Sequence, residues 1–342
     1  MQRIVIAQPG GYDQLRVLNE PDPQPKAGDV RIRVAACGVN YADGIIRMGL
    51  YESAKRLHGY PITPGFEVAG VIDALGEDAE GFSIGDRVVA VTLFGGYASH
   101  LCLPTDRVFA LPSSLSFEQG AALPTVFLTA WFMAHRQVHP DAGQRWLVHS
   151  AAGGVGGALL QMARLADVQA VGIVGASHKR EVALAQGAAH VIDKSQGHWS
   201  QQARGLAPAG YDAIFDANGV STLSDSWNLL APMGKLVIFG FASMLPKNGR
   251  VNWLRLAWDW LRTPRFSPLE MTTSNRSVMA ANLSFLSAEA PLLRRGMLWL
   301  LERFADGRLQ PPPVEAFPLA DAAKAQQRIE SGQSVGKIVL LP

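Results

Sequence analysis

Cysteine is almost absent from this chain of 342 residues, which contains only Cys37 and Cys102. Two thiols cannot form a disulfide framework, and without a C-x-x-C pair the sequence lacks the usual thiolate ligands of structural zinc. The histidines also show no spacing typical of metal ligands. These absences predict a protein of a reducing compartment, and we expect it to be cytoplasmic.

Long hydrophobic runs are missing as well. The apolar stretches are short and interrupted by glycine, which argues against a membrane-spanning helix, and the N-terminus "MQRIVIAQPG" does not resemble a signal peptide. The 31 basic and 29 acidic residues give a net charge of +2 without a block of like charge, so no nucleic-acid surface is expected. Charged residues make up only 18% of the chain, which favours an oligomer, and we predict a homodimer.

The length and the high apolar content, 48%, instead predict a globular protein of two domains. The first third contains short β-rich runs such as "DVRIRVAACGV" and "EVAGVIDALG", separated by Gly, Pro and Asp. This pattern predicts a small antiparallel barrel-like domain. A helical pattern follows from residue 117 and is interrupted at Pro124.

From residue 145 onward, strand-like and helix-like segments alternate. This order is typical of a parallel sheet covered by helices on both faces. We therefore predict an α/β protein in which a doubly wound parallel sheet of the Rossmann type is combined with a β-rich domain. The last part of the chain reads as a helix, a loop, a second helix and a final strand.

The stretch "WLVHSAAGGVGGALLQMA" has the order strand, glycine turn and helix that a dinucleotide fold requires. Ala151, Gly153 and Gly156 stand at the three glycine positions of G-x-G-x-x-G. Gly153 would allow the backbone to approach a pyrophosphate, and Gly156 would allow the helix to pack closely on the strand. The first N–H groups of the helix, from Gly154 and Val155 onward, would bind the phosphates.

The end of the next strand, "QAVGIVG", indicates which nucleotide is bound. NAD-binding proteins place an acid there to hold the ribose hydroxyls. Here the strand ends at Gly175 and is followed by Ser177, Lys179 and Arg180. Because the acid is missing and cations stand where a 2′-phosphate would lie, we predict NADPH as the cofactor.

The segments "AACGVNYADGIIRMGLY", "PITPGFEVAGVI", "GGYASH", "HSAAGGVGGALLQMA" and "GKIVLLP" occur in this order, and with them the chain resembles the zinc-free quinone oxidoreductases of the medium-chain dehydrogenase/reductase superfamily. "NLLAPMGKLVIFGFA" and "SNRSVMAANLSFL" are most similar to the vesicle amine transport protein branch. The resemblance implies a GroES-like catalytic domain over 1–124, a Rossmann domain over 125–270 and a C-terminal segment, 271–342, that returns to the catalytic domain.

The zinc enzymes of this superfamily carry Cys and His ligands in the first domain, the His just before a Glu. Here Asn40 stands at the Cys position and Phe66 at the His position, before Glu67. Neither side chain can replace a thiolate or an imidazole. We therefore expect no metal, and we expect Glu67 to be a structural carboxylate with a buried partner, either an arginine or backbone N–H groups.

The resemblance also assigns Asn40 and Tyr51 to the nicotinamide and substrate cleft. Asn40 would bond a substrate carbonyl or the cofactor's ribose or amide, and Tyr51 would stabilise an oxyanion or be a half-buried aromatic residue. Lys179 corresponds to the lysine at the 2′-phosphate, and Lys194 replaces a tyrosine of the relatives. The predicted cofactor-binding residues are Thr129, Gly153, Gly154, Val155, Gly156, Ser177, Lys179, Lys194, Asn218 and Phe239.

These features predict a zinc-independent, NADPH-dependent reductase of quinones or α,β-unsaturated carbonyls, with hydride transfer in a cleft between the domains. The alternative is an NADPH-binding adaptor that associates with membranes or a protein partner. It is motivated by the Trp-rich segment 250–265, where Trp253, Leu256, Trp260 and Leu261 recur at helical spacing. This segment would contact a membrane, cover the cleft, join an oligomer interface or pack on its own protein.

Overall fold

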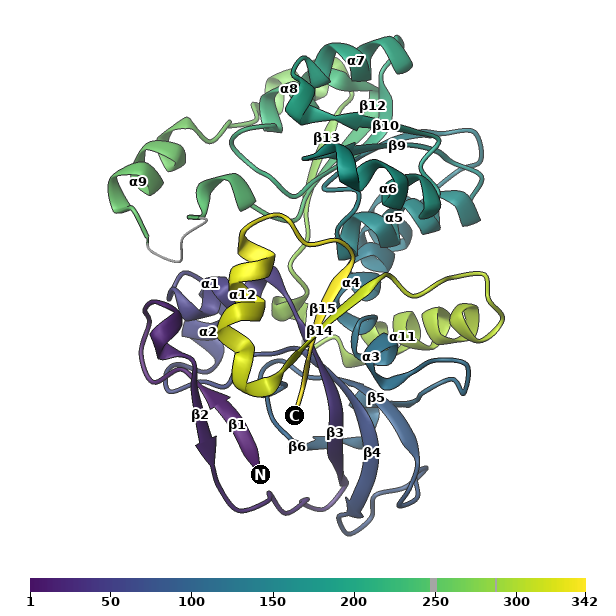
Figure 1. Cartoon of the computed structure of the whole chain (residues 1–342). Helices are drawn as coiled ribbons and strands as arrows, with labels where there is room; N and C mark the ends of the chain where they lie inside the picture. Colours follow the sequence, from purple (N-terminus) through teal and green to yellow (C-terminus); the bar gives the residue numbers. More distant parts are fainter. Residues whose placement is uncertain (247–250, 287) are drawn as a thin grey trace. The chain divides into compact units, whose positions relative to one another are not determined.

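The computed structural model describes residues 1–246, 251–286 and 288–342, and these form two compact units (Figure 1). Unit 1 contains residues 1–128 and 283–342, and unit 2 contains 129–246 and 251–282. Residues 271–282, which the sequence placed in the C-terminal segment, therefore belong to unit 2. Of the Trp-rich segment 250–265, residue 250 lies outside the described residues.

Unit 1 is built on a seven-stranded sheet in the order β14-β15-β3-β4-β5-β7, with β6 paired to β3. Neighbouring strands are antiparallel except for β14 and β15. The strands of this unit are β1 (Gln2–Val5), β2 (Arg16–Asn19), β3 (Asp29–Val39), β4 (Glu67–Leu75), β5 (Arg87–Val91), β6 (His100–Pro104), β7 (Val108–Ala110), β14 (Val314–Pro318) and β15 (Lys337–Leu341).

The core of unit 1 lies on one face of this sheet. Alternating residues of β3, including Val30, Ile32 and Val34, are buried against apolar residues of β4 and β15, as the period of two in a strand requires. The helices of this unit are α1 (Tyr41–Arg47), α2 (Glu52–Leu57), α3 (Phe117–Ala121), α11 (Ala290–Ala305) and α12 (Ala322–Glu330). Helix α12 packs on α1 and β15, which joins the C-terminal part of the chain to its N-terminal part.

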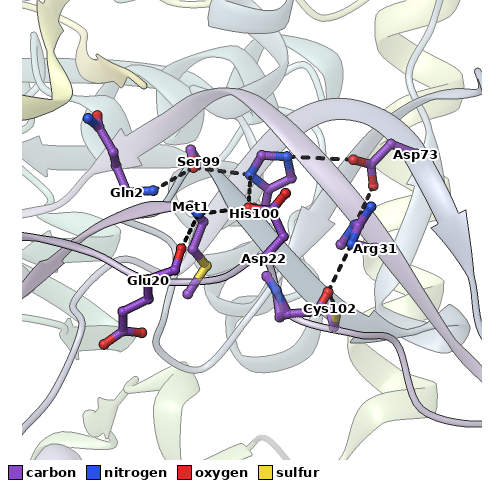
Figure 2. A network of polar contacts seen from close by, with 10 residues as sticks. Met1, Gln2, Glu20, Asp22, Arg31, Asp73, Ser99, His100 and Cys102 are labelled. Atoms are coloured by element: carbon purple, nitrogen blue, oxygen red, sulfur yellow. Dashed lines mark hydrogen bonds and ion pairs between the residues drawn. The ribbon is translucent and has the colours of Figure 1, made fainter.

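A cluster of polar side chains ties the N-terminus to this sheet (Figure 2). Arg31 Nε donates to Asp73 Oδ1 at 2.8 Å, and the His100 ring lies 3.5 Å from Asp73 and 3.6 Å from Asp22. The amino group of Met1 lies 2.7 Å from Asp22. These groups are partly exposed, so solvent screens them and each pair adds little to stability. His100 thus has a structural role at the surface.

Unit 2 is a six-stranded sheet in the order β10-β9-β8-β11-β12-β13, with every pair parallel. The predicted doubly wound sheet is confirmed. Its strands are β8 (Arg145–His149), β9 (Gln169–Val174), β10 (His190–Asp193), β11 (Tyr211–Asp216), β12 (Leu230–Ile238) and β13 (Ser277–Ala280). The strand order reverses at β8, and in such sheets ligands bind at the carboxyl ends of the strands beside this point.

The helices of unit 2 are α5 (Gly154–Leu165), α6 (Arg180–Ala185), α7 (Trp199–Leu206), α8 (Leu223–Leu229), α9 (Trp253–Arg262) and α10 (Pro268–Ser274). Helix α4 (Pro124–Trp131) begins at the proline that interrupts the helical pattern and runs from unit 1 into unit 2. In the described residues, no helix is long and apolar enough to cross a membrane.

Candidate active site

The glycine turn lies between β8 and α5, at the switch point of the sheet. Gly153 is the N-cap of α5, which starts at Gly154. A Cβ atom on Gly156 would lie 2.3 Å from the backbone oxygen of Ser150, so only glycine allows the helix to lie this close to the strand. The first N–H groups of a helix have no acceptor within it and point outward. This turn therefore fits the pyrophosphate of a dinucleotide.

The next two strands end beside each other, and their loops contain the predicted phosphate-binding residues. Ser177 and Lys179 follow β9, and Lys194 follows β10. Sequence reasoning missed Asp193, a buried acid at the end of β10. Ser177 Oγ donates to Asp193 Oδ2 at 2.6 Å, and the backbone N–H and hydroxyl of Ser195 donate to Asp193 Oδ1.

These bonds determine the ionisation of Asp193 and the direction of the Ser177 hydroxyl. Hydrogen bonds from the Ser177 and Ser195 hydroxyls lower the pKa of Asp193, so it is ionised at neutral pH. The only hydroxyl hydrogen of Ser177 is directed to this carboxylate, so Ser177 cannot donate it to a phosphate at the same time. Lys194 lies close to the end of β9, since its Cε would be 3.7 Å from a Cβ atom on Gly175.

A turn after β11 is organised by the buried carboxylate of Asp216. Its Oδ1 accepts hydrogen bonds from the backbone N–H groups of Asn218, at 2.8 Å, and Gly219, at 3.1 Å, and its Oδ2 accepts from Ser226 Oγ at 2.8 Å. The N–H of Phe239, after β12, donates to the backbone oxygen of Asp216 at 3.0 Å. The structure thus brings together the two residues, Asn218 and Phe239, that were predicted at the ends of these strands.

His149, the last residue of β8, supports this turn from inside the sheet. It is fully buried, and its ring nitrogens lie 3.0 Å from Ser226 Oγ and 3.2 Å from Asn218 Nδ2. Trp199 packs edge-on against the ring. Burial lowers the pKa of His149, and the nearby Asp216 only partly opposes this effect.

We expect His149 to make the protein less stable in acid. The native state keeps the ring neutral, whereas the unfolded chain takes up a proton below about pH 6.5. As the pH decreases below this value, the free energy of unfolding therefore decreases by up to ~1.4 kcal/mol per pH unit. Between pH 7 and 5.5, urea unfolding should show a loss about 1 kcal/mol larger for the wild type than for His149→Gln. Parallel pH profiles for the two proteins would contradict this role.

In unit 1, the candidate site is built around Glu67, the first residue of β4. Glu67 is fully buried, and its Oε1 lies 2.6 Å from Lys337 Nζ and accepts from Asn40 Nδ2 at 2.9 Å. Its Oε2 accepts from the backbone N–H of Thr125, in the first turn of α4, at 2.6 Å. The predicted backbone partner is confirmed. The predicted arginine is wrong, because the cation is a lysine from the last strand.

Gly38, on β3, leaves the room that this carboxylate needs. A Cβ atom there would lie 2.3 Å from Glu67 Oε1 and 2.5 Å from the backbone oxygen of Ala121. The second contact is to backbone, which cannot move aside cheaply. Any larger residue would therefore displace the carboxylate from its partners.

Tyr51 contacts Phe66, the residue that precedes Glu67. Its ring packs edge-on against Phe66, with the ring centroids 6.0 Å apart, and Phe66 contacts Phe94. The Tyr51 hydroxyl is 2.5 Å from Ser284 Oγ, a partner that sequence reasoning missed. Of the two predicted catalytic residues, Tyr51 thus lies beside the apolar Phe66, and Asn40 lies beside the charged Glu67. Thr129 lies in the last turn of α4, within unit 2.

The described residues contain no group of three or more His, Cys, Asp or Glu side chains that could hold a metal ion. Asn40 and Phe66, which stand where the zinc enzymes carry their Cys and His ligands, offer a primary amide and a benzene ring. Phe66 is buried among apolar side chains. Nearby, the Lys337 ammonium already compensates the charge of Glu67.

Comparison with known proteins agrees with this arrangement. A family model described as "Alcohol dehydrogenase GroES-like domain" matches residues 26–113, and one described as "Zinc-binding dehydrogenase" matches 186–340. The fold and these matches define a member of the medium-chain dehydrogenase/reductase superfamily, a superfamily of oxidoreductases, and the chain belongs to it.

Within this superfamily, the chain is similar to two named groups. A synaptic vesicle membrane protein VAT-1 homolog of Danio rerio is 34% identical over 98% of this chain and 69% of the relative. The quinone oxidoreductase of Sus scrofa is 31% identical over 100% of this chain and 98% of the relative. The crystal structure of Escherichia coli quinone oxidoreductase complexed with NADPH has a TM-score of 0.86 and 26% identity, with 100% of both chains covered.

Proposed function

We propose that this protein is a zinc-independent, NADPH-dependent reductase of quinones or other α,β-unsaturated carbonyls. The observation that carries the proposal is the glycine turn at the switch point of the sheet, followed by Lys179 and Lys194 at the ends of the next two strands. A similar fold binds NADPH in the quinone oxidoreductase of Escherichia coli. When bound, NADPH supplies a hydride.

The residues of unit 2 would hold the cofactor by its phosphates. The N-terminus of α5 would receive the pyrophosphate, and the tight contact at Gly156 keeps that N-terminus close to the strand end. Lys179 and Lys194 would bind the 2′-phosphate, and Asp193, already bonded to Ser177 and Ser195, would hold their loops in place. Asn218 and Phe239 would line the nicotinamide side through the turn at Asp216.

The residues of unit 1 would bind the substrate. The ring of Tyr51, packed on Phe66, offers an apolar surface to a quinone or enone, and its hydroxyl would donate to the carbonyl oxygen. As the electrophilic carbon gains the hydride, this oxygen gains an electron pair, and a proton from Tyr51 or water completes the reduction. Proximity of the two reactants supplies much of the rate.

Zinc independence is supported by the chemistry of the residues at the expected ligand positions. Asn40 and Phe66 cannot replace a thiolate and an imidazole. In addition, the buried ammonium of Lys337 lies 2.6 Å from the carboxylate of Glu67 and would repel a divalent cation.

NADPH oxidation with a panel of 1,4-quinones and enones tests the proposal. We expect turnover that persists in the presence of a strong zinc chelator, since no step uses a metal. Binding of NADPH should be measured in parallel. Tight NADPH binding without turnover of any acceptor would contradict the enzymatic function, and loss of activity with the chelator would contradict zinc independence. A homodimer and a cytoplasmic location also stay predictions, and light scattering in solution would test the first.

The second candidate, an adaptor that contacts membranes, is favoured by the surface of α9. Trp253, Leu254, Trp258 and Leu261 share one side of this helix and are 60–86% exposed. The charged residues Arg255, Asp259 and Arg262 share the opposite side. An amphipathic helix with exposed tryptophan and arginine is typical of proteins that lie at a membrane surface.

Flotation with vesicles that contain anionic phospholipid separates the two functions. If α9 binds the membrane, the variant Trp253→Ala/Trp258→Ala should float at least several-fold less than the wild type, because two large apolar groups of that side are lost. Met233→Ala, which removes another exposed apolar side chain of unit 2, is the matched control. Equal flotation of the Trp variant and the wild type would exclude α9 as the contact.

A further inference from the structure

The amide of Asn40 has a defined orientation because it lies between two opposite charges. Asn40 is only 7% exposed and is the N-cap of α1. Its Oδ1 accepts a hydrogen bond from Lys337 Nζ, and its Nδ2 donates to Glu67 Oε1 at 2.9 Å. A flipped amide would place Oδ1 against the carboxylate and the NH₂ group against the ammonium, and both contacts would be repulsive.

This orientation determines what Asn40 can offer to a ligand. Its oxygen is bound to a buried ammonium, whereas its nitrogen carries two hydrogens and makes one hydrogen bond within the described part of the chain. The second hydrogen is therefore the polar group that Asn40 can present. The ammonium on Oδ1 also polarises the amide, which makes this N–H a stronger donor.

We propose that the Lys337–Glu67 pair is a positioning device that fixes Asn40 as a hydrogen-bond donor to the carbonyl oxygen of the substrate. This inference rests on the proposed reductase function and makes it more specific. It assigns Asn40 to the oxygen that becomes negative as the hydride arrives, as a donor rather than as an acceptor for the cofactor's amide or ribose. Lys337 and Glu67 are positioning residues, since they act through Asn40.

The contact at Thr125 shows how this device can be reversed. Glu67 Oε2 accepts the backbone N–H of Thr125 at 2.6 Å, so in Glu67→Gln the amide oxygen should stay at this N–H. The new NH₂ group then faces Asn40 and favours the flipped amide, provided that the ammonium is also removed. The double variant Lys337→Met/Glu67→Gln should therefore turn the Asn40 donor away, and it removes the two opposite charges of the pair together.

The experiment is a double-mutant cycle on kcat with a quinone that the wild type reduces. Asn40→Ala should lower kcat by about 100-fold in the wild type, the usual effect of losing one donor to an oxyanion. Lys337→Met/Glu67→Gln should lower kcat by at least ~10-fold. In that background Asn40→Ala should lower kcat by no more than about twofold, because the Asn40 donor already points away from the substrate. The NADPH dissociation constant should stay within about twofold of wild type throughout.

A purely structural role gives another pattern. In that case Asn40→Ala costs the same factor in both backgrounds, and this result would overturn the proposal. Lys337→Arg, which keeps the cation, should retain most of kcat, and circular dichroism should show that each variant is folded.

A second readout does not depend on turnover. With ¹⁵N-labelled asparagine, the two Asn40 side-chain protons should differ in the wild type, one protected by Glu67 and one exchanging with solvent. The double variant should lose this difference. If the wild type reduces no acceptor, the proposed function fails while this measurement still tests the orientation. An unchanged Asn40 signal in the double variant would overturn the positioning role whatever the activity.

Discussion

Replacing Arg47 by methionine is expected to lower the free energy of unfolding by about 3–5 kcal/mol. Arg47 is fully buried in α1, and its guanidinium bonds Glu330 at 2.7 Å, Gln326 at 2.8 Å and the backbone oxygen of Gly10 at 2.9 Å. The variant leaves the buried carboxylate of Glu330 without its cation. Urea denaturation followed by circular dichroism measures the loss.

Two further variants make this test specific. Arg47→Met/Glu330→Gln removes both charges and should recover part of the stability, because no buried charge is left unpaired. Arg56→Met is the matched control, since Arg56 bonds Glu52 at the same distance, 2.7 Å, but is 69% exposed at the surface. It should change the free energy of unfolding by less than about 0.5 kcal/mol. Equal effects of Arg47→Met and Arg56→Met would contradict the account.

Replacing Lys179 by alanine is expected to raise the NADPH dissociation constant by about 10- to 100-fold, the value of one charge-assisted hydrogen bond to a phosphate. NADH lacks the 2′-phosphate, so its dissociation constant should change by less than about twofold. Fluorescence titration with both nucleotides measures this difference.

The control for this prediction is Lys324→Ala, which removes a lysine that is 68% exposed and paired with Asp321 in unit 1. It should leave both dissociation constants unchanged. If Lys179→Ala weakens the binding of NADPH and NADH equally, or changes the binding of neither nucleotide, the prediction is wrong and the 2′-phosphate is bound elsewhere in unit 2.

The glycine turn of unit 2 could be predicted because its signals are local. The strand, the glycine turn and the helix from 146 to 163 are consecutive, and close packing at Gly156 follows from the pattern itself. Asp193 was missed for the opposite reason. It lies on β10, the neighbouring strand, and only the parallel pairing of β9 and β10 brings it to Ser177.

The candidate residues of unit 1 were predicted only in part. The apolar context of Glu67 indicates a buried carboxylate, but its partner Lys337 lies 270 positions later in the sequence, and nothing local connects the two. Pairing of β15 with β3 brings Lys337 to this region. Ser284, the partner of Tyr51, was missed for the same reason, since the two residues are far apart in the sequence. The strands β13 and β14 were missed because four or five residues carry too little periodicity to reveal a strand.

The most direct test of the reductase function follows the hydride itself. NADPH that carries deuterium at the transferable C4 position is incubated with the enzyme and an enone, with chelator present, and the product is analysed by mass spectrometry and NMR. The account predicts one deuterium at the β-carbon of the saturated product. Recovery of unchanged enone, or of product without deuterium, under conditions where NADPH is bound would contradict it.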